Sequence, residues 1–291
     1  MGAGSACKMK KIGFVDYHID EWHANNYPQW IRESSRKDEF ELAYAWQEES
    51  QDGLRSLEEW CKDFNATTAS SVEQVVEECD GIIVLAPSNP EVHERLADIP
   101  LRSGKPVYID KPFAPDKATA ERLFAKAEKH GTPMFSSSAL RFGPEIQQAV
   151  KETLKGQTVE FAISAGGGTS FEEYSIHQIE MLVMMMGTGA TKVMQCGSGR
   201  TSQMLIDYSS GRRCAMTLMP GHGFQLSACA EKDTVTINSM TNFFPGLIEK
   251  ILEFFDTKCP PVVKEDTIEI VSILEAGIKA QVNQDSWIDL A

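Results

Sequence analysis

Short apolar runs separated by helix-like segments dominate the first 140 residues of this 291-residue chain. The runs lie at residues 11–16, 40–46, 81–86, 106–110 and 133–137. Because they lack the alternation of half-exposed strands, they are expected to be buried on both faces, as in a parallel sheet covered by helices. Two intervening helices have start signals, Ser71 before Val75 and Asp116 before residues 118–129. The pattern predicts an α/β domain with a doubly wound parallel sheet.

From residue 158 onward, the pattern changes to strand-like runs with turn signals. These runs lie at 159–165, 192–196, 204–208, 214–218 and 234–237, and Ser209–Gly211 is typical of a hairpin turn. Helical patterns occur at 171–186, 244–255 and 265–281, the first with an apolar face that includes Ile176 and Val183. We therefore predict a doubly wound domain at 10–140 and an α+β domain at 141–291, built on an open, mostly antiparallel sheet.

The balance of charge excludes several classes of partner. The chain has 28 Lys and Arg against 42 Asp and Glu, a net charge of −14, which disfavours nucleic acid and anionic membrane surfaces. Its seven scattered cysteines form no C-x-x-C pair, so reduced thiols are expected rather than disulfides or a zinc knuckle. No apolar stretch approaches the ~20 residues of a membrane span. Residues 1–9, an expected disordered leader, lack a signal core, and we predict a cytoplasmic protein.

Lys111 stands just past a predicted strand, between Asp110 and Pro112. Ligands of doubly wound folds bind outside the carboxyl ends of the strands. A lysine there can give a proton or a hydrogen bond to a substrate oxygen. The alternative is an ordinary solvated loop lysine, because lysine is common on protein surfaces.

Glu173 and His177 share one face of the predicted helix at 171–186, with Glu180 one turn further along. A carboxylate beside an imidazole can fix its tautomer and raise its basicity, which suits a general base near neutral pH. The glycines at 166–168 allow close backbone approach just upstream. The alternative is an ordinary surface contact between side chains four residues apart.

The segment after the first apolar run lacks the glycines of a dinucleotide site. Such sites use G-x-G-x-x-G to bring backbone amides to the pyrophosphate, whereas residues 16–21 are Asp-Tyr-His-Ile-Asp-Glu. Three carboxylates there would repel two phosphates, which argues against the usual pose.

The same segment offers ligand types for a divalent metal in Asp16, His18, Asp20 and His23. Their spacing matches no standard ligand pair. The alternative is a polar loop with Asp20 as the N-cap of the next helix, and we predict no metal site.

Five further motifs follow one another along the chain. They are A-P-S-N-P-E-V-H at 86–93, G-K-P-V-Y-I-D-K-P-F-A at 104–114, R-F-G-P at 141–144, the glycine run before His177, and C-P-P-V-V-K-E-D at 259–266. In this order they resemble the motifs of the Gfo/Idh/MocA oxidoreductases, which include glucose-fructose oxidoreductase and inositol dehydrogenase. The similarity extends from Lys11 to Gln281.

This resemblance implies a Rossmann-like dinucleotide-binding domain, NAD or NADP as cofactor, and a sugar, polyol or related hydroxy compound as small-molecule substrate. It implies that Lys111 assists proton transfer at the substrate hydroxyl, that His177 is the catalytic histidine, and that Glu173 orients the imidazole. The cofactor-binding positions are then Asp16, Tyr17, His18, Trp46, Pro87, Ser88, Asn89, His93 and Asp110. Relatives commonly pair through the open face of the C-terminal sheet, so a homo-oligomer is expected.

The cofactor end departs from the family pattern more than the chemistry end. The glycines are absent, and bulky Trp46 stands where the second strand ends, although Glu48 could reach a ribose. Glu173 is one methylene longer than the aspartate it replaces. The alternative hypothesis is therefore a ligand-binding or regulatory protein that no longer turns over a dinucleotide. Non-redox chemistry in the same cleft, such as lyase or hydrolase action, is a third.

Overall fold

The computed structural model describes residues 8–197 and 202–291, so most of the predicted leader lies outside the described residues. Two compact units are present. Unit 1 comprises residues up to Asp110 with 123–135 and 248–261, and unit 2 comprises 111–122, 136–247 and 262–291. The predicted domains, 10–140 and 141–291, stay predictions, because packing units and independently folding domains are different properties.

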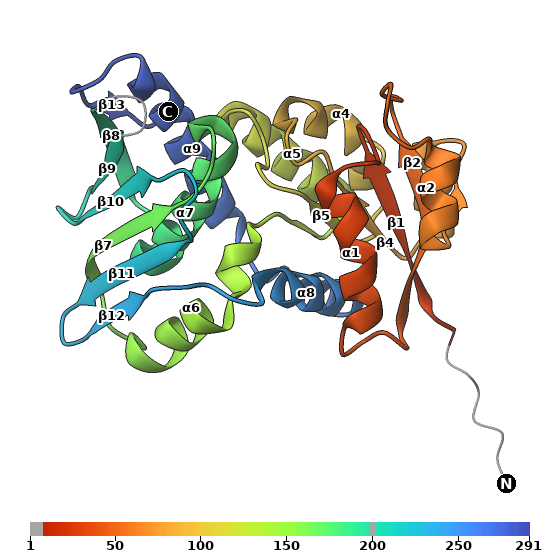
Figure 1. Cartoon of the computed structure of the whole chain (residues 1–291), viewed down its shortest axis with the longest axis horizontal. Coiled ribbons are helices and arrows are strands. Elements are labelled where there is room, and N and C mark those ends of the chain that lie inside the picture. The colour runs from red at the N-terminus through yellow and green to blue at the C-terminus, as the bar shows by residue number, and fades with distance from the viewer. Residues whose placement is uncertain (1–7, 198–201) are drawn as a thin grey trace, which may run out of the picture. The chain divides into compact units, whose positions relative to one another are not determined.

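Unit 1 is built on sheet A, a six-stranded parallel sheet with the strand order β3-β2-β1-β4-β5-β6 (Figure 1). Its strands are β1 (Lys10–Asp16), β2 (Phe40–Gln47), β3 (Thr67–Thr68), β4 (Gly81–Val84), β5 (Val107–Ile109) and β6 (Met134–Phe135). All five predicted runs form strands of this sheet, and only the two-residue β3 was not predicted. The order of strands reverses between β1 and β4, and doubly wound folds bind ligands at the carboxyl ends of such strands.

Helices connect these strands in the expected alternation. They are α1 (Trp22–Glu33), α2 (Leu57–Phe64), α3 (Val72–Glu78), α4 (His93–Leu96) and α5 (Lys117–His130), with 3₁₀ turns η1 (Pro90–Val92) and η2 (Pro100–Arg102). The predicted cap Ser71 accepts from the Gln74 amide, and Asp116 accepts from the Thr119 amide at 2.7 Å. A Cβ on Gly13 would lie 2.3 Å from Val75 Cγ1, so β1 packs directly against α3.

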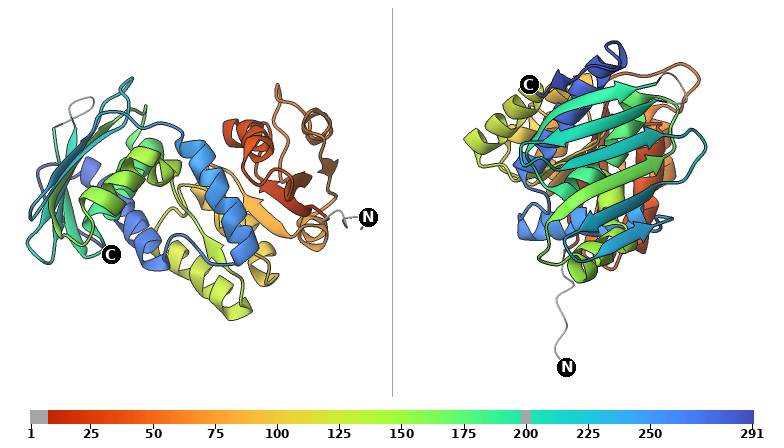
Figure 2. Two further views of the ribbon diagram at one scale, coloured as in Figure 1. Left: turned by 90° about the horizontal axis from the view of Figure 1, so that it is seen from below. Right: turned by 90° about the vertical axis from the view of Figure 1, so that its left-hand side faces the viewer.

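Unit 2 is built on sheet B, whose order is β12-β11-β7-β10-β9-β8-β13. Its strands are β7 (Val159–Gly166), β8 (Ala190–Cys196), β9 (Gln203–Tyr208), β10 (Arg213–Leu218), β11 (Gln225–Ala230), β12 (Thr234–Ile237) and β13 (Ile288–Asp289). Only β10 and β7 pair in parallel, which confirms the mostly antiparallel sheet. Neither β11 nor β13 was predicted. The right-hand view of Figure 2 shows the strands of sheet B side by side.

Helices α7 and α9 bury their apolar sides against sheet B. The remaining helical elements are η3 (Ala139–Phe142), α6 (Pro144–Gln148), the π-helical η4 (Ala149–Thr153), α7 (Phe171–Met186), α8 (Phe243–Thr257) and α9 (Lys264–Gln281). The bounds of α7 agree with the prediction, and Ile176 and Val183 are buried as expected. From Ile248 onward α8 belongs to unit 1, where the Phe255 ring occupies the space above Gly81.

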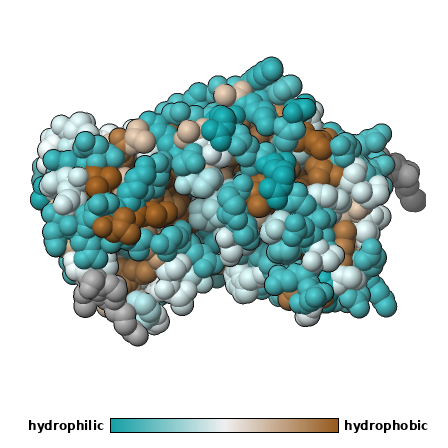
Figure 3. Space-filling model, turned by 90° about the horizontal axis from the view of Figure 1, so that it is seen from above, coloured by the Kyte–Doolittle hydropathy of each residue, from teal (hydrophilic) through white to brown (hydrophobic). Residues whose placement is uncertain are grey.

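The surface seen in Figure 3 is mainly hydrophilic with scattered apolar patches. Among the described residues, no helix combines the length and apolar character needed to span a bilayer. The six cysteines in the described ranges are all unpaired thiols, and Cys7 lies outside those ranges.

Candidate functional site

The carboxyl edge of sheet A carries a buried acidic residue at the end of β1. Asp16 is fully buried, and its Oδ1 accepts the Tyr17 amide at 2.6 Å. Within the described part of the chain, its Oδ2 has no hydrogen-bond partner. Burial, and next the negative charge of Glu21, raise the pKa of Asp16 well above its ordinary value. Asp16 therefore binds a proton more readily than an ordinary aspartate, and when it is ionised it repels an anion.

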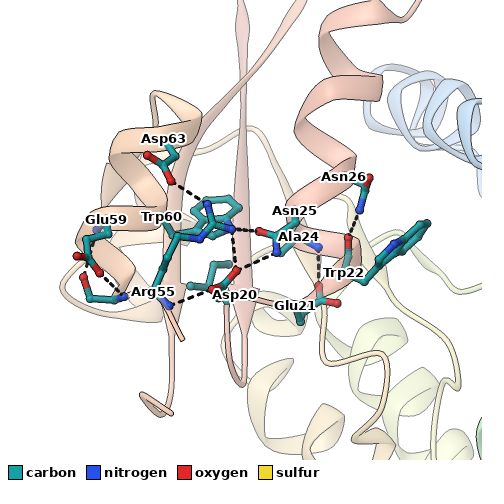
Figure 4. A network of polar contacts seen from close by, with 12 residues as sticks. Asp20, Glu21, Trp22, Ala24, Asn25, Asn26, Arg55, Glu59, Trp60 and Asp63 are labelled. Carbon is teal, nitrogen blue, oxygen red and sulfur yellow. Dashed lines mark hydrogen bonds and ion pairs between the residues drawn. The ribbon is translucent and has the colours of Figure 1, made fainter. Parts of the chain in front are cut away.

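Helix α1 begins immediately after Glu21, whose carboxylate caps it. The His23 amide donates to Glu21 Oε2 at 2.7 Å, and the Ala24 amide donates to Oε1 (Figure 4). Burial raises the pKa of Glu21 to about 7, against the opposing effect of His23 and the two amides. Asp20, the predicted N-cap, does not cap the helix.

Asp20 instead forms an ion pair with Arg55, at 2.7 Å from its Nη2 to Asp20 Oδ1. The same guanidinium contacts Asp63 Oδ2 at 2.8 Å and the Asn25 side chain (Figure 4). Hydrogen bonding by Arg55 holds the pKa of Asp20 well below its usual range. The pairing draws Asp20 away from the amides of α1, which explains why the neighbouring carboxylate caps them.

Asp110 follows β5 and is fully buried. Its Oδ2 contacts His23 Nδ1, and its Oδ1 accepts the Tyr108 hydroxyl at 3.2 Å. The Tyr27 hydroxyl lies 3.3 Å from His23 Nδ1. The predicted cofactor residues Asp16 and Asp110 thus belong to one buried cluster with Glu21 and His23.

The other predicted cofactor residues on this edge bond to the chain itself. The Tyr17 hydroxyl donates to Glu49 at 2.9 Å, and His18 Nδ1 lies 3.0 Å from the Glu49 carbonyl oxygen. Trp46 is half-buried near the end of β2. Glu48, which could have reached a ribose, forms an ion pair with Arg95.

The loop after β4 contains the remaining predicted cofactor residues. Pro87 is buried, Ser88 is exposed, and Asn89 is half-buried with its amide donating to Glu91 at 2.9 Å. His93 is fully buried, and its Nε2 bonds the Leu85 carbonyl at 2.7 Å. Ser88 is therefore the residue of this loop that is most open to a ligand.

These contacts show whether the N-terminus of α1 can bind the diphosphate of a dinucleotide. A diphosphate needs the N-terminal amides of α1, and the Glu21 carboxylate already accepts from two of them. Asp16 and Asp110 add like charge nearby. With Glu21 in this position, the residues do not fit the diphosphate of a dinucleotide.

The described ranges hold no group of three or more His, Cys, Asp or Glu side chains placed to bind a metal ion. The four ligand types noted above point to different partners. His18 contacts a carbonyl and Asp20 contacts Arg55, while His23 contacts Asp110.

The predicted catalytic residues His177 and Lys111 both lie in unit 2. His177, on α7, is half-buried, and its Nδ1 lies 2.7 Å from Ser138 Oγ. Lys111 is 8% exposed and precedes Pro112 with a cis peptide bond. Glu173 is half-buried in the first turn of α7. Ser138, which follows β6, was not predicted.

Glu180 lies one turn beyond His177 and is buried. It contacts Arg141 Nε and accepts the Ser137 hydroxyl at 2.8 Å. Arg141 also reaches Asp266, at 3.2 Å between Nη1 and Oδ2. The R-F-G-P motif, recognised in the sequence without a role, thus supplies a positive charge that pairs with both carboxylates.

A cavity of about 400 Å³ lies elsewhere in unit 2. It is lined by Phe171 and Glu172 of α7, by Met204 and Met216 of sheet B and by neighbouring residues, and neither Lys111 nor His177 lines it. The cavity therefore does not mark the predicted catalytic residues.

We compared the sequence and fold of this chain with those of known proteins. A family model described as an oxidoreductase family with an NAD-binding Rossmann fold matches residues 17–137. Over these residues the chain is similar to the Gfo/Idh/MocA oxidoreductases. The structure confirms the predicted fold class, with a doubly wound parallel sheet and a second, mostly antiparallel sheet.

Individual proteins are similar to this chain in sequence or in fold, all at low sequence identity. A myo-inositol dehydrogenase, Hyg17, of Streptomyces leeuwenhoekii is 26% identical over 159 residues, covering 49% of this chain and 48% of that protein. The match thus spans about half the length of this curated relative. The structure of myo-inositol 2-dehydrogenase from Lactobacillus plantarum has a TM-score of 0.78 at 14% identity, covering 98% of this chain and 100% of that chain. The structure of WlbA dehydrogenase from Bordetella pertussis, solved with NADH and UDP-GlcNAcA, has a TM-score of 0.76 at 14% identity. The match covers 98% of this chain and 99% of that chain.

Proposed function

We propose that the protein is an oxidoreductase acting on a hydroxyl or carbonyl group of a small polyhydroxylated compound, such as a polyol or sugar, with NAD or NADP as hydride carrier. The main support is the contact between His177 and Ser138, at 2.7 Å, in the same unit as buried Lys111. The similarity to an inositol dehydrogenase supports the substrate class.

The chain's own residues supply the proton-handling half of such a reaction. Lys111 holds or releases a proton at the substrate oxygen, as a buried amine can. His177 assists, because an imidazole exchanges protons near neutral pH once its ring is oriented. Ser138 orients that ring through Nδ1, and we assign Glu173, one turn earlier on α7, the same supporting role.

Turnover of a panel of inositols and sugars with NAD⁺ and NADP⁺, followed at 340 nm, tests this proposal. We expect Lys111→Met to lower turnover at least ~100-fold, the scale of general acid–base catalysis, without unfolding the protein. Lys117→Met is the matched control, because the Lys117 ammonium contacts the Ala291 carbonyl oxygen at the chain end. Undiminished turnover in Lys111→Met would remove this lysine from the mechanism.

A second candidate is a ligand-binding or regulatory protein without hydride transfer, which the Glu21 cap on α1 favours. Thermal unfolding with NAD⁺, NADH, NADP⁺ and NADPH at about 1 mM discriminates the two. A ligand at ~100 times its Kd adds about 2.7 kcal/mol to stability, which raises the midpoint by several degrees. No shift with any of the four favours the second candidate.

We also propose a cytoplasmic location and a homo-oligomer. The unpaired cysteines of the described ranges support the first. Phe161 and Ile163, 42% and 44% exposed on β7, support self-association through the outer face of sheet B, which sedimentation equilibrium can test.

A further inference from the structure

The N-terminus of α1 is already engaged by a negatively charged group of the chain itself. Two of its first amides, those of His23 and Ala24, donate to the Glu21 carboxylate. A helix N-terminus attracts anions through its unpaired amides and its dipole. A carboxylate offers the same acceptor oxygens and sign of charge as a phosphate, so Glu21 satisfies what a diphosphate would satisfy.

The surroundings of Glu21 make this contact more than an ordinary helix cap. Asp16 at the end of β1 is fully buried, and its Oδ2 has no hydrogen-bond partner among the described residues. Asp110 after β5 is also fully buried. The His23 ring contacts Asp110, and the hydroxyls of Tyr27 and Tyr108 complete the cluster. Three mutually interacting carboxylates, two of them beside the His23 imidazole, thus lie where an anionic cofactor would have to approach.

We propose that Glu21 is an intramolecular competitor of the cofactor diphosphate, which must be displaced or neutralised before a dinucleotide binds at α1. This inference rests on the proposed nicotinamide-dependent function and adds a control on its cofactor binding. It gives the protein a low affinity for dinucleotides while Glu21 is ionised. Replacing the side chain by a smaller neutral one should therefore raise that affinity.

The competition should depend on pH, because only the ionised carboxylate repels phosphate. Burial raises the pKa of Glu21 to about 7, so its charge is mostly lost at pH 6 and mostly present at pH 8. If binding requires the neutral form, the apparent Kd for NAD⁺ falls about tenfold from pH 8 to pH 6. The groups facing Glu21 that can modulate this are Asp16, His23, Tyr27 and Asp110, and Tyr108 acts on Tyr27 and Asp110.

Calorimetric titration of the full-length protein tests the proposal, with NAD⁺ and NADH at pH 8 and with NAD⁺ alone at pH 6. Glu21→Ser keeps a good N-cap oxygen but removes the charge and most of the length. Glu33→Ser is the matched control, because Glu33 is exposed at the opposite end of the same helix. We expect Glu21→Ser to bind at least ten times more tightly than wild type at pH 8 and to lose the pH dependence, while Glu33→Ser behaves like wild type.

Two results would overturn the proposal, and they differ in what they leave standing. Equal, measurable affinity of wild type and Glu21→Ser refutes the competition but retains the nicotinamide-dependent function. Absence of binding by both, and by Glu21→Gly, refutes the competition and the nicotinamide-dependent function together. If Glu21→Ser does not fold, Glu21→Gln, which keeps the length and loses the charge, carries the same expectations.

Discussion

The two buried polar clusters of the molecule differ in their balance of charge. In unit 2, Arg141 lies between Glu180 and Asp266, so each carboxylate has a cationic partner. In unit 1, Glu21 and Asp110 both interact with His23, and the negative charges of these two carboxylates also act on Asp16. The first cluster places a guanidinium beside both carboxylates, although Arg141 Nη2 has no hydrogen-bond partner among the described residues. In the second cluster, the pKa values of Asp16 and Glu21 are raised above their ordinary values. The difference teaches that the carboxylates near the proposed proton-handling residues have a permanent cation beside them, while those near the proposed cofactor position do not.

The largest expected effect comes from breaking the compensated cluster. Arg141→Met leaves the Glu180 carboxylate buried without its cation, and losing one partner of a buried pair costs about 3–5 kcal/mol of stability. Urea denaturation of the purified variant measures this loss.

Arg213→Met is the matched control, because Arg213 pairs with Asp207 on the exposed side of sheet B. An exposed pair contributes little, so this variant should remain close to wild type. Equal losses in both variants would show that Arg141 acts through packing rather than through charge.

A smaller effect is expected from the uncompensated cluster, and its sign follows from the pKa of Glu21. That pKa is about 7 in the folded chain against an ordinary value of 4.5. The folded state therefore binds more protons between these values, and its free energy of unfolding falls as pH rises from about 5 to about 7. In Glu21→Gln, the decrease in the free energy of unfolding over this pH range should be smaller by roughly 2–3 kcal/mol. Urea denaturation at pH 5 and pH 7.5 measures it, and an unchanged slope would contradict the assignment.

The smallest effect concerns the orientation of His177. Ser138→Ala removes the hydroxyl 2.7 Å from Nδ1, so we expect kcat to fall about tenfold with little change in KM. Ser138→Thr keeps the hydroxyl and should restore kcat. A fall in kcat that threonine does not restore would indicate a packing role for Ser138.

The sequence predicts elements best where several local signals agree. Helix α7 has a serine cap at Ser170, a buried apolar side and Gly187 after its last turn, and its bounds match the prediction. Strand β11 was missed because Gln225–Ala230 is rich in small and polar residues. It is a strand because it pairs with β7, which is distant in sequence, and with β12.

The candidate site shows the same limit more sharply. Asp20 and Glu21 are adjacent carboxylates, and local sequence favours Asp20 because aspartate is a preferred N-cap residue. Arg55, 35 residues beyond Asp20, reverses this preference because it draws the Asp20 side chain away. Ser138 was missed because the run of serines after β6 does not indicate which hydroxyl meets His177. Long-range contacts decide both cases.

Arg55 also has a consequence for how the chain moves. Its guanidinium contacts Asp20 before α1, Asn25 within α1 and Asp63 in α2. The connection after β1 is therefore fastened to two helices by one side chain, and it cannot fray residue by residue. Local opening there must release these contacts together, so the connection and the first turn of α1 open as a single cooperative unit, and rarely.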